Sequence, residues 1–238
     1  MVSSLYSSTL MAFVDIALIP ARGGSKGLSN KNLLEIKGRT LLQRVIDSAI
    51  NSNKFSEIYV SSENHEILSL ARTAGVSVLE RAVEAATDSA TADDVVSDFL
   101  SKLKVREVDR VRLTYLQPTS PFRTSDHING ALDVANTHES RSCVSICKVS
   151  QHPEKMLRIA SGFLESYSTS HIQNLSANRQ ALPTIYLPNG AIYVFPVPRF
   201  QKIQTFPIKG SGYIEMDAVS SIDIDSAIDL TLARALGL

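Results

Sequence analysis

The sequence contains no tryptophan, few aromatic residues and no excess of charge of either sign. Only 6% of its 238 residues are aromatic, and 24 basic side chains balance 24 acidic ones. The core must therefore be mainly aliphatic. A neutral chain that is 44% hydrophobic is unlike a disordered, strongly charged segment. It also lacks the overall positive field of a general nucleic-acid or membrane-surface binder, so we expect neither partner.

Cysteine is scarce as well, and the two cysteines present are badly spaced for a disulfide. If Cys143 and Cys147 share one strand, their Cα atoms lie about 13 Å apart. A disulfide needs them within about 7 Å. We therefore expect two free thiols, which is typical of a reducing, cytoplasmic location. No second pair of Cys or His residues is available to complete a metal site with them.

Long hydrophobic runs are absent, and none approaches the roughly 20 residues of a membrane-spanning helix. The first 13 residues are rich in serine and lack the basic start of a secretory signal. We expect residues 1–13 to form a flexible tail. The remaining residues 14–238 suit one α/β domain.

Hydrophobic runs alternate with segments of helical periodicity along most of the chain. Runs typical of strands occupy residues 14–20, 58–61, 76–79, 111–116, 143–149 and 190–195. Helical patterns or caps are found at residues 41–49, 64–74, 91–103, 124–135 and 226–236. Strands that alternate with helices in this way predict an α/β fold with a mostly parallel sheet.

The alternation stops between about residues 150 and 188, where the sequence is polar and has no clear period. A structureless stretch of this length is uncommon within a compact domain. We therefore expect an inserted subdomain or a dimerisation arm.

A basic, glycine-containing loop follows the first predicted strand. Adjacent Gly23 and Gly24 allow backbone N–H groups to approach an anion closely. Arg22, Lys26 and Lys31 add three positive charges, and no acid lies between residues 16 and 34. The loop suits a triphosphate, although it matches neither G-x-G-x-x-G nor G-x-x-x-x-G-K-[ST]. The alternative interpretation is a solvated basic turn.

Acidic residues recur near the C-terminus in the segment Ser-Ile-Asp-Ile-Asp. If this segment is a strand, Asp223 and Asp225 point the same way. Mg²⁺ is commonly held by one or two carboxylates together with phosphate oxygens of a substrate. The alternative is that Asp225 merely caps the last helix while Asp223 is solvated.

Two further segments carry polar groups near predicted strands. Gln117, in Leu-Gln-Pro-Thr-Ser-Pro-Phe-Arg, can read a base edge or a sugar hydroxyl, while Arg123 anchors the loop. A rigid connector is the alternative for this segment. Asn189 and Gly190 are typical of a hairpin turn, although Tyr193 can instead line a pocket.

Together these four segments resemble the CMP-sialic acid synthetases, the acylneuraminate cytidylyltransferases, from about residue 16 to residue 236. The shared motifs read Ile-Pro-Ala-Arg-Gly-Gly-Ser-Lys-Gly, Leu-Gln-Pro-Thr-Ser-Pro-Phe-Arg, Pro-Asn-Gly-Ala-Ile-Tyr and Ser-Ile-Asp-Ile-Asp. The resemblance implies a Rossmann-like nucleotidyltransferase that joins CTP and a nonulosonic acid, with Mg²⁺ as cofactor. It also implies a homodimer in which residues 150–188 form an arm and the active sites are shared.

The resemblance also implies roles for individual residues. Nucleotide contacts would come from Arg22, Gly23, Gly24, Ser25, Lys26, Lys31, Asn32, Arg81, Asp88 and Ser89. Sugar contacts would come from Gln117, Lys155, Arg179, Asn189, Tyr193 and Phe206, with Lys155 and Arg179 reaching into the partner's site. Asp223 and Asp225 would bind Mg²⁺ and, with Arg22 and Lys26, form the catalytic set.

Three departures from the family pattern leave the exact sugar open. Ser29 stands where relatives often have proline, and Ser61-Ser62-Glu63 replaces the family's Ser-Thr-Asp. Phe206 is a single aromatic where sialate-specific members can carry two. We expect an N-acylneuraminate as the acceptor, with legionaminate or pseudaminate as alternatives. An eight-carbon ulosonate, or a noncatalytic nucleotide-binding sensor, ranks below these.

Overall fold

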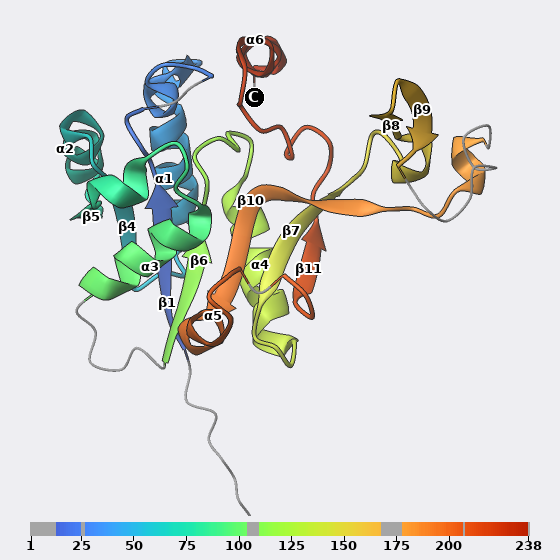
Figure 1. Cartoon of the computed structure of the whole chain (residues 1–238). Coiled ribbons are helices and arrows are strands. Elements are labelled where there is room, and N and C mark those ends of the chain that lie inside the picture. The colour runs from blue at the N-terminus through green and yellow to red at the C-terminus, as the bar shows by residue number, and fades with distance from the viewer. Residues whose placement is uncertain (1–12, 25–26, 104–109, 168–177, 207, 238) are drawn as a thin grey trace, which may run out of the picture.

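A mostly parallel sheet of seven strands forms the centre of the molecule (Figure 1). The computed structural model describes residues 13–24, 27–103, 110–167, 178–206 and 208–237. The strand order is β11-β7-β10-β6-β1-β4-β5. Strand β10 runs antiparallel to both β6 and β7, whereas the other four pairings are parallel. The α/β fold with a mostly parallel sheet is therefore confirmed.

The strands and helices follow the predicted alternation closely. The sheet consists of β1 (Val14–Pro20), β4 (Glu57–Ser62), β5 (Ser77–Glu80), β6 (Val111–Tyr115), β7 (Cys143–Lys148), β10 (Tyr186–Pro196) and β11 (Gly212–Glu215). The helices are α1 (Leu41–Ser52), α2 (His65–Thr73), α3 (Ala92–Lys102), α4 (Ser125–Thr137), α5 (Val197–Ile203) and α6 (Ala227–Leu236). Strands β2 (Glu35–Ile36) and β3 (Arg39–Thr40) pair with each other before α1.

Helices cover both faces of the sheet with aliphatic side chains. Helices α1, α2 and α4 pack on one face, where Leu42, Val45 and Ile46 of α1 are buried against strand residues such as Ala17 and Ile19. Helices α3 and α5 pack on the other face around Phe99, Phe195 and Phe200. A smaller cluster joins α6 to the start of α1. The predicted apolar face of residues 41–49 is thus the buried face of α1.

Side-chain caps explain where the helices begin. Thr40, Thr91, Thr124 and Ser226 each accept a backbone N–H three residues ahead and form capping boxes. Asn64 accepts the N–H groups of Glu66 and Ile67 at the start of α2. The predicted caps Asn64 and Thr91 are confirmed, and the helices expected to begin near residues 124 and 226 do so.

Of the two interpretations of the segment around Asn189 and Gly190, the hairpin turn is wrong. Both residues lie inside the continuous strand β10, whose register with β7 shifts between Pro188 and Tyr193. Gly190 has φ of +79°, in the left-handed region of the backbone. Both a hairpin turn and an irregularity within a strand can require this conformation. The local pattern identified the backbone conformation but could not distinguish these two uses of it.

The segment with the two acids is not a strand, contrary to expectation. Residues 222–225 form an irregular stretch, and the Ile224 N–H donates to the Thr119 carbonyl at 2.8 Å. The last helix is capped by Ser226 rather than by Asp225. Buried Ile224 therefore fixes the segment, with the two acids on either side of it.

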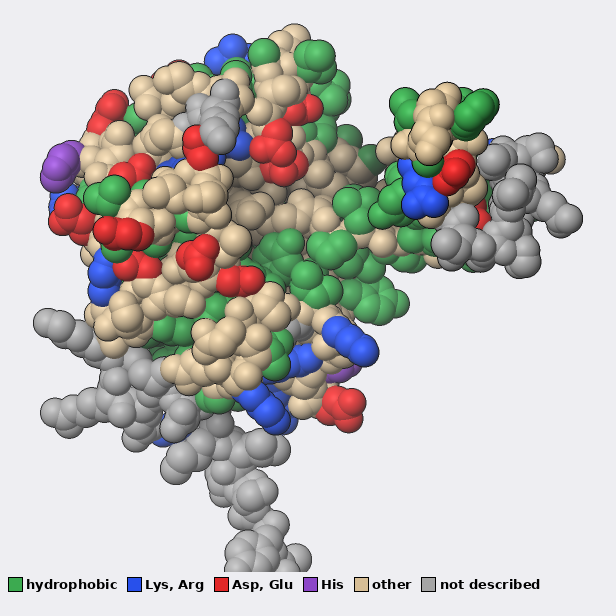
Figure 2. All heavy atoms as spheres, viewed as in Figure 1, with side chains coloured by type: hydrophobic (Ala, Val, Ile, Leu, Met, Phe, Trp, Pro, Cys, Tyr) green, Lys and Arg blue, Asp and Glu red, His purple; other side chains and the backbone are tan. Residues whose placement is uncertain are grey.

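Of the predicted insertion at residues 150–188, the described residues up to 185 form an arm beyond the sheet (Figure 1), whereas residues 186–188 already belong to β10. The arm includes the short helical turns η4 (Pro153–Lys155) and η6 (Arg179–Ala181), and the antiparallel strands β8 (Leu157–Ala160) and β9 (Phe163–Ser166). Strands β8 and β9 make a separate two-stranded sheet. Ile159, Phe163 and Leu164 are 70–80% exposed there, and hydrophobic side chains are visible on the outside of the arm (Figure 2).

Three other expectations concern the chain as a whole. Of the predicted tail at residues 1–13, only Phe13 lies within the described residues, with the Arg112 guanidinium 5.6 Å from its ring centroid. Cys143 and Cys147 are free thiols, as predicted. No helix in the described part of the chain is long and apolar enough to cross a membrane.

Candidate active site

A cavity of about 380 Å³ opens at the carboxyl ends of the parallel strands. Open α/β sheets bind ligands at this edge because loops from neighbouring strands meet there. The cavity is lined by Pro20, Arg22, Lys31, Asn32, Arg81, Ala85, Thr87, Asp88, Ala90, Thr91, Ala92, Val95, Tyr115, Gln117, Pro118, Thr119, Asp223 and Asp225. The structure thus brings together eight of the residues predicted from sequence.

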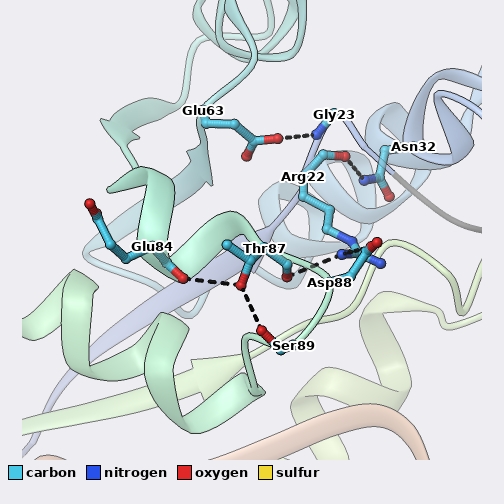
Figure 3. A network of polar contacts seen from close by, with 8 residues as sticks. All are labelled: Arg22, Gly23, Asn32, Glu63, Glu84, Thr87, Asp88 and Ser89. Carbon is cyan, nitrogen blue, oxygen red and sulfur yellow. Dashed lines mark hydrogen bonds and ion pairs between the residues drawn. The ribbon is translucent and has the colours of Figure 1, made fainter.

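The loop that follows β1 is held against the start of α2 (Figure 3). The Gly23 N–H donates to Glu63 Oε1 at 2.6 Å. A Cβ on Gly23 would lie 2.6 Å from Asn64 Nδ2, so only glycine fits at this position. Asn32 Nδ2 donates to the Arg22 carbonyl at 2.8 Å and joins the far end of the loop to its beginning. Asn32 therefore shapes the loop as well as lining the cavity.

Arg22 reaches across the cavity to the segment before α3 (Figure 3). Its Nη1 donates to Asp88 Oδ1 at 2.8 Å and to the Thr87 carbonyl at 3.3 Å. The Ser89 hydroxyl lies 3.2 Å from Thr87 Oγ1 and orders the same turn. Two residues predicted to contact the nucleotide are therefore ion-paired with each other across the cavity.

Arg81 enters the cavity from the turn after β5. Its side chain is buried, and it donates from Nε to Ser61 Oγ at 3.1 Å and from Nη2 to the Ser61 carbonyl at 2.6 Å. Burial lowers the pKa of this guanidinium, although it remains a cation at neutral pH. The two bonds to Ser61 fix its direction, so Arg81 supplies a rigid positive group to the cavity wall.

Two carboxylates line the cavity beside Lys31 of the basic loop. Lys31 Nζ lies 2.9 Å from Asp225 Oδ1. Asp223 is more enclosed, and its Oδ1 is a buried atom without a hydrogen-bond partner in the described structure. Burial, and then the nearby charge of Asp225, raises the pKa of the Asp223 carboxyl. A bound cation would offset both the burial of the Asp223 carboxylate and its repulsion by Asp225.

The donor set fits a hard cation that also needs ligands from a substrate. Within the described ranges, no group of three or more His, Cys, Asp and Glu side chains is arranged to hold a metal ion. Asp223 and Asp225 supply carboxylate oxygens at one side of the cavity, and Asp223 Oδ1 is a buried atom without a partner in the described structure. Mg²⁺ commonly takes one or two carboxylates and completes its shell with water and phosphate oxygens. The two aspartates therefore fit Mg²⁺ together with a nucleotide.

The basic loop and the acidic segment also touch directly. A Cβ added to Gly27 would lie 2.5 Å from the Asp225 carbonyl oxygen. Real Cβ atoms essentially never approach another heavy atom within 3.0 Å. Gly27 therefore permits the close approach that places the basic loop beside the acids.

Gln117 enters the cavity from the turn after β6, and a buried arginine supports that turn. Arg123 Nη1 donates to the carbonyls of Gln117 and Ala191 at 3.0 and 2.9 Å. Complete burial lowers the pKa of Arg123 to about 9. A Cβ on Gly190 would lie 2.8 Å from Gln117 Oε1, so the irregularity in β10 leaves room for this amide. The prediction that Arg123 anchors the loop is confirmed.

An aromatic cluster stands beside the cavity. The ring centroids of Tyr193 and Phe206 are 4.9 Å apart, and Phe206 lies 5.0 Å from Tyr115, which lines the cavity. Burial, followed by the charge of Asp223, raises the pKa of the Tyr193 hydroxyl. Tyr193 does not itself line the cavity, but its ring centroid lies 6.4 Å from that of Tyr115, which does.

Other predicted site residues are placed differently. The Asn189 amide is occupied within the protein, since its Oδ1 accepts from Ser145 Oγ and the Ala191 N–H, and its Nδ2 donates to Ser221 Oγ. Lys155 lies in the arm and does not line the cavity of its own chain, and Arg179 belongs to the turn η6 of the same arm. Ser25 and Lys26 lie outside the described residues.

Two residues of the site were not predicted as such. Thr119 lines the cavity, and its hydroxyl bonds to Asp223 and lowers the pKa of that acid. Thr119 lies in the same motif as Gln117, so its position at the strand end was an available signal. Glu63 had no such signal, because only the folded loop brings it to the Gly23 N–H.

Comparisons with known proteins agree with this geometry. Residues 16–195 match the family described as Cytidylyltransferase. An N-acylneuraminate cytidylyltransferase of Streptococcus agalactiae is 33% identical over 90% of this chain and 51% of its own length. A CMP-N,N'-diacetyllegionaminic acid synthase of Legionella pneumophila is 32% identical over 93% of this chain and 95% of its own.

A solved structure shares the fold at low sequence identity. A CMP:2-keto-3-deoxy-manno-octonic acid synthetase complexed with CTP has a TM-score of 0.67 and 15% identity. The similarity covers 93% of this chain and 97% of the other. The chain spans about half the length of several curated relatives that it matches.

Proposed function

The chain belongs to the cytidylyltransferase family, and we propose that it transfers CMP from CTP to the anomeric hydroxyl of a nonulosonic acid. Pyrophosphate is the second product. One observation carries this proposal: residues of the basic, glycine-containing loop and two carboxylates line the same cavity. A nucleoside triphosphate with a divalent cation needs both signs of charge within a few ångströms.

In the proposed reaction the hydroxyl oxygen of the acid attacks the α-phosphorus of CTP, and the bond to the pyrophosphate oxygen breaks. Catalysis of such a transfer depends on positioning and on charge stabilisation. Arg22 is placed to stabilise the negative charge that grows on the leaving pyrophosphate, and we assign Lys26 the same role. Gly23, Gly24, Ser25, Lys31 and Asn32 form the remainder of the triphosphate site in this proposal.

The base and ribose are assigned to the opposite wall. Arg81 offers a fixed guanidinium there, and the Asp88–Ser89 turn offers hydrogen-bonding groups for ribose or cytosine. Because Arg22 and Asp88 pair with each other in this structure, the nucleotide must replace that ion pair on binding. Asp88 then becomes available to accept hydrogen bonds from the nucleotide.

Mg²⁺ is the proposed cofactor, held by Asp223 and Asp225. Bound there, the cation would supply Lewis-acid neutralisation of the phosphate oxygens. The Asp223 Oδ1 atom, buried and without a partner in the described structure, supports this assignment. The ion pair with Lys31 holds the Asp225 carboxylate at the edge of the cavity.

The acceptor is assigned to the side of Gln117, Tyr193 and Phe206. An N-acylneuraminate is the first choice, because several relatives carry that name. Relatives named for legionaminic and pseudaminic acids keep those two sugars as alternatives. The apolar faces of the sugar would pack on the aromatic rings, while Gln117 bonds its hydroxyl groups.

We further propose a homodimer in which the arm completes the site of the partner. Lys155 and Arg179 would bind the acceptor carboxylate there, and Lys155 does not line the cavity of its own chain. The exposed apolar side chains of β8 and β9 support an interface on the arm. The two free thiols favour a reducing compartment, and we assign the activity to the cytoplasm.

The test is pyrophosphate release from CTP with a panel of nine-carbon and eight-carbon ulosonic acids, with and without Mg²⁺. Release with a nine-carbon acid and Mg²⁺ is expected, and Arg22→Ala and Asp223→Asn should each lower kcat by roughly 10²–10³-fold. Ile228→Ala on the exposed side of α6 serves as the matched control. A wild-type protein that releases no pyrophosphate with any member of the panel refutes the proposal.

The shared site has a separate test. Mixing inactive Arg22→Ala with inactive Arg179→Ala protein should restore activity, because a mixed dimer contains one site with neither change. No recovery in a mixture shown to contain mixed dimers would refute the sharing of sites.

A further inference from the structure

A short loop after α5 is fastened to the first turn of α3, far away in sequence. Asp93 Oδ2 accepts from the Thr205 hydroxyl at 2.9 Å, and Asp93 Oδ1 accepts from the Phe206 N–H at 2.9 Å. Both carboxylate oxygens are therefore committed to two adjacent residues. Gln204 ends α5 in the left-handed region, with φ of +54°, and turns the chain into this contact.

Helix α3 forms part of the nucleotide wall at the same turn. Thr91, Ala92 and Val95 line the cavity, and Asp93 lies between them in sequence. Thr91 and Asp94 fix the start of the helix through a capping box. Asp93 is thus held on a rigid element whose neighbouring residues face the proposed nucleotide site.

The fastened loop carries one of the aromatic rings assigned to the acceptor. Phe206 packs edge-on against Tyr115 at 5.0 Å and Tyr193 at 4.9 Å between ring centroids. It also contacts Phe195 at 5.2 Å. Phe206 thereby fills the space beside Tyr193, and a displaced Phe206 would leave the Tyr193 ring without one of its supports.

We propose that Asp93 is a positioning residue for the acceptor acid, because it holds Phe206 and, through it, Tyr193 in place beside the nucleotide wall. The inference rests on the proposed function and adds a residue whose own side chain does not line the cavity. The two charge-assisted hydrogen bonds to Asp93 restrict the motion of the Phe206 loop, which explains how this one aromatic residue can shape the acceptor side where relatives can carry two. The clamp formed by Asp93, Thr205 and Phe206 joins the nucleotide wall to the acceptor wall.

The test separates the two substrates by steady-state kinetics of pyrophosphate release. Asp93→Ala removes both hydrogen bonds, and we expect KM for the acceptor acid to rise roughly tenfold. KM for CTP should stay within twofold of wild type. The hydrogen bonds of Arg81 to Ser61 and the capping box of Thr91, which shape the nucleotide wall, are unchanged. Asp133→Ala, which removes an exposed acid from α4, is the control for loss of one negative charge.

Two conservative variants test the geometry of the clamp. Asp93→Asn keeps an oxygen for the Phe206 N–H and offers an NH₂ group to the Thr205 oxygen, so it should restore acceptor KM to within threefold of wild type. Thr205→Val removes only one bond and should give an intermediate value. The double variant Asp93→Ala/Thr205→Val should be no worse than Asp93→Ala, since both changes break the same contact.

A structural readout identifies the cause of the kinetic change. Hydrogen exchange of the peptide that contains Phe206 should become faster in Asp93→Ala and remain slow in Asp93→Asn. An unchanged acceptor KM in Asp93→Ala, or equal rises in KM for both substrates, overturns the inference. A wild-type protein inactive with every acid refutes the proposed function instead, so the two failures are distinguishable.

Discussion

Replacing Gly27 with alanine tests whether contact between the basic loop and the acidic segment is essential to the site. The new Cβ would lie 2.5 Å from the Asp225 carbonyl oxygen, against a practical minimum of 3.0 Å. The obstructing atom belongs to the backbone, and Ile224 beside it is bonded to Thr119 and buried among α6 residues. The loop must therefore move away by at least about 0.5 Å.

Two consequences of that displacement can be estimated. Forcing an extra methyl group into a tight contact costs about 1–3 kcal/mol. For a chain of this size, about 2 kcal/mol lowers Tm by about 4–8 °C. A misplacement of about 1 Å can cost 10²-fold in rate, so we expect kcat/KM to fall roughly 10–100-fold.

The assay is pyrophosphate release together with thermal unfolding, and Gly130→Ala in α4 is the matched control. A Cβ on Gly130 would meet only Ile214 Cγ2 at 3.9 Å, an ordinary contact. Alanine is preferred to glycine within a helix by up to about 1 kcal/mol, so Tm should rise slightly and activity should not change. If Gly27→Ala keeps kcat/KM within threefold of wild type, the loop does not depend on this contact.

Two other predictions concern the scaffold. Asp15→Ala leaves the buried guanidinium of Arg112 without the carboxylate that accepts from its Nε at 2.6 Å and its Nη2 at 2.9 Å, so thermal unfolding should show a loss of roughly 3 kcal/mol. A Tm within 2 °C of wild type would contradict this, and adding Arg112→Met should recover part of the loss. Burial raises the pKa of Cys143 to about 12, so a thiol reagent at pH 8 should label only Cys147 in the folded protein and both cysteines after unfolding. The pKa of the Cys143 thiol is higher in the folded protein than the unfolded value of about 8.5, so burial of the neutral thiol contributes its full stabilisation below about pH 8.5. This contribution to the free energy of unfolding decreases as the pH rises toward 12, which unfolding measurements at several pH values can test.

The sequence predicted elements well where local chemistry specifies them. Asn64 and Thr91 cap helices because their side chains accept N–H groups two or three residues ahead, a relation visible in the sequence. Helix α5 and strand β11 were not predicted. Helix α5 has only seven residues, and β11 has four with Tyr213 exposed, so neither carries a full hydrophobic period.

The site was predictable in its parts but not in its internal contacts. Arg22 and Gln117 follow the ends of β1 and β6, and the general geometry of α/β sheets brings such ends together. Asp223 instead reaches the cavity from an irregular segment. The bond between Gly23 and Glu63, and the clamp between Asp93 and Phe206, join segments 40 and 113 residues apart. No local pattern encodes such pairs, because they depend on how α2, α3 and α5 are placed around the sheet.

The neutrality of the chain has a local counterpart inside the site. Arg22 pairs with Asp88 and Lys31 pairs with Asp225, so two cations of the basic loop are balanced by acids that line the same cavity. The acids Asp88 and Asp225 are 42% and 73% exposed, so water weakens both pairs and the cost of separating the ions is low. Under the proposed function, triphosphate oxygens replace Asp88 at Arg22 while Mg²⁺ compensates Asp223 and Asp225. Binding of the triphosphate and Mg²⁺ then replaces ion pairs within the protein by ion pairs with the ligands. The net charge of the whole sequence cannot reveal this replacement.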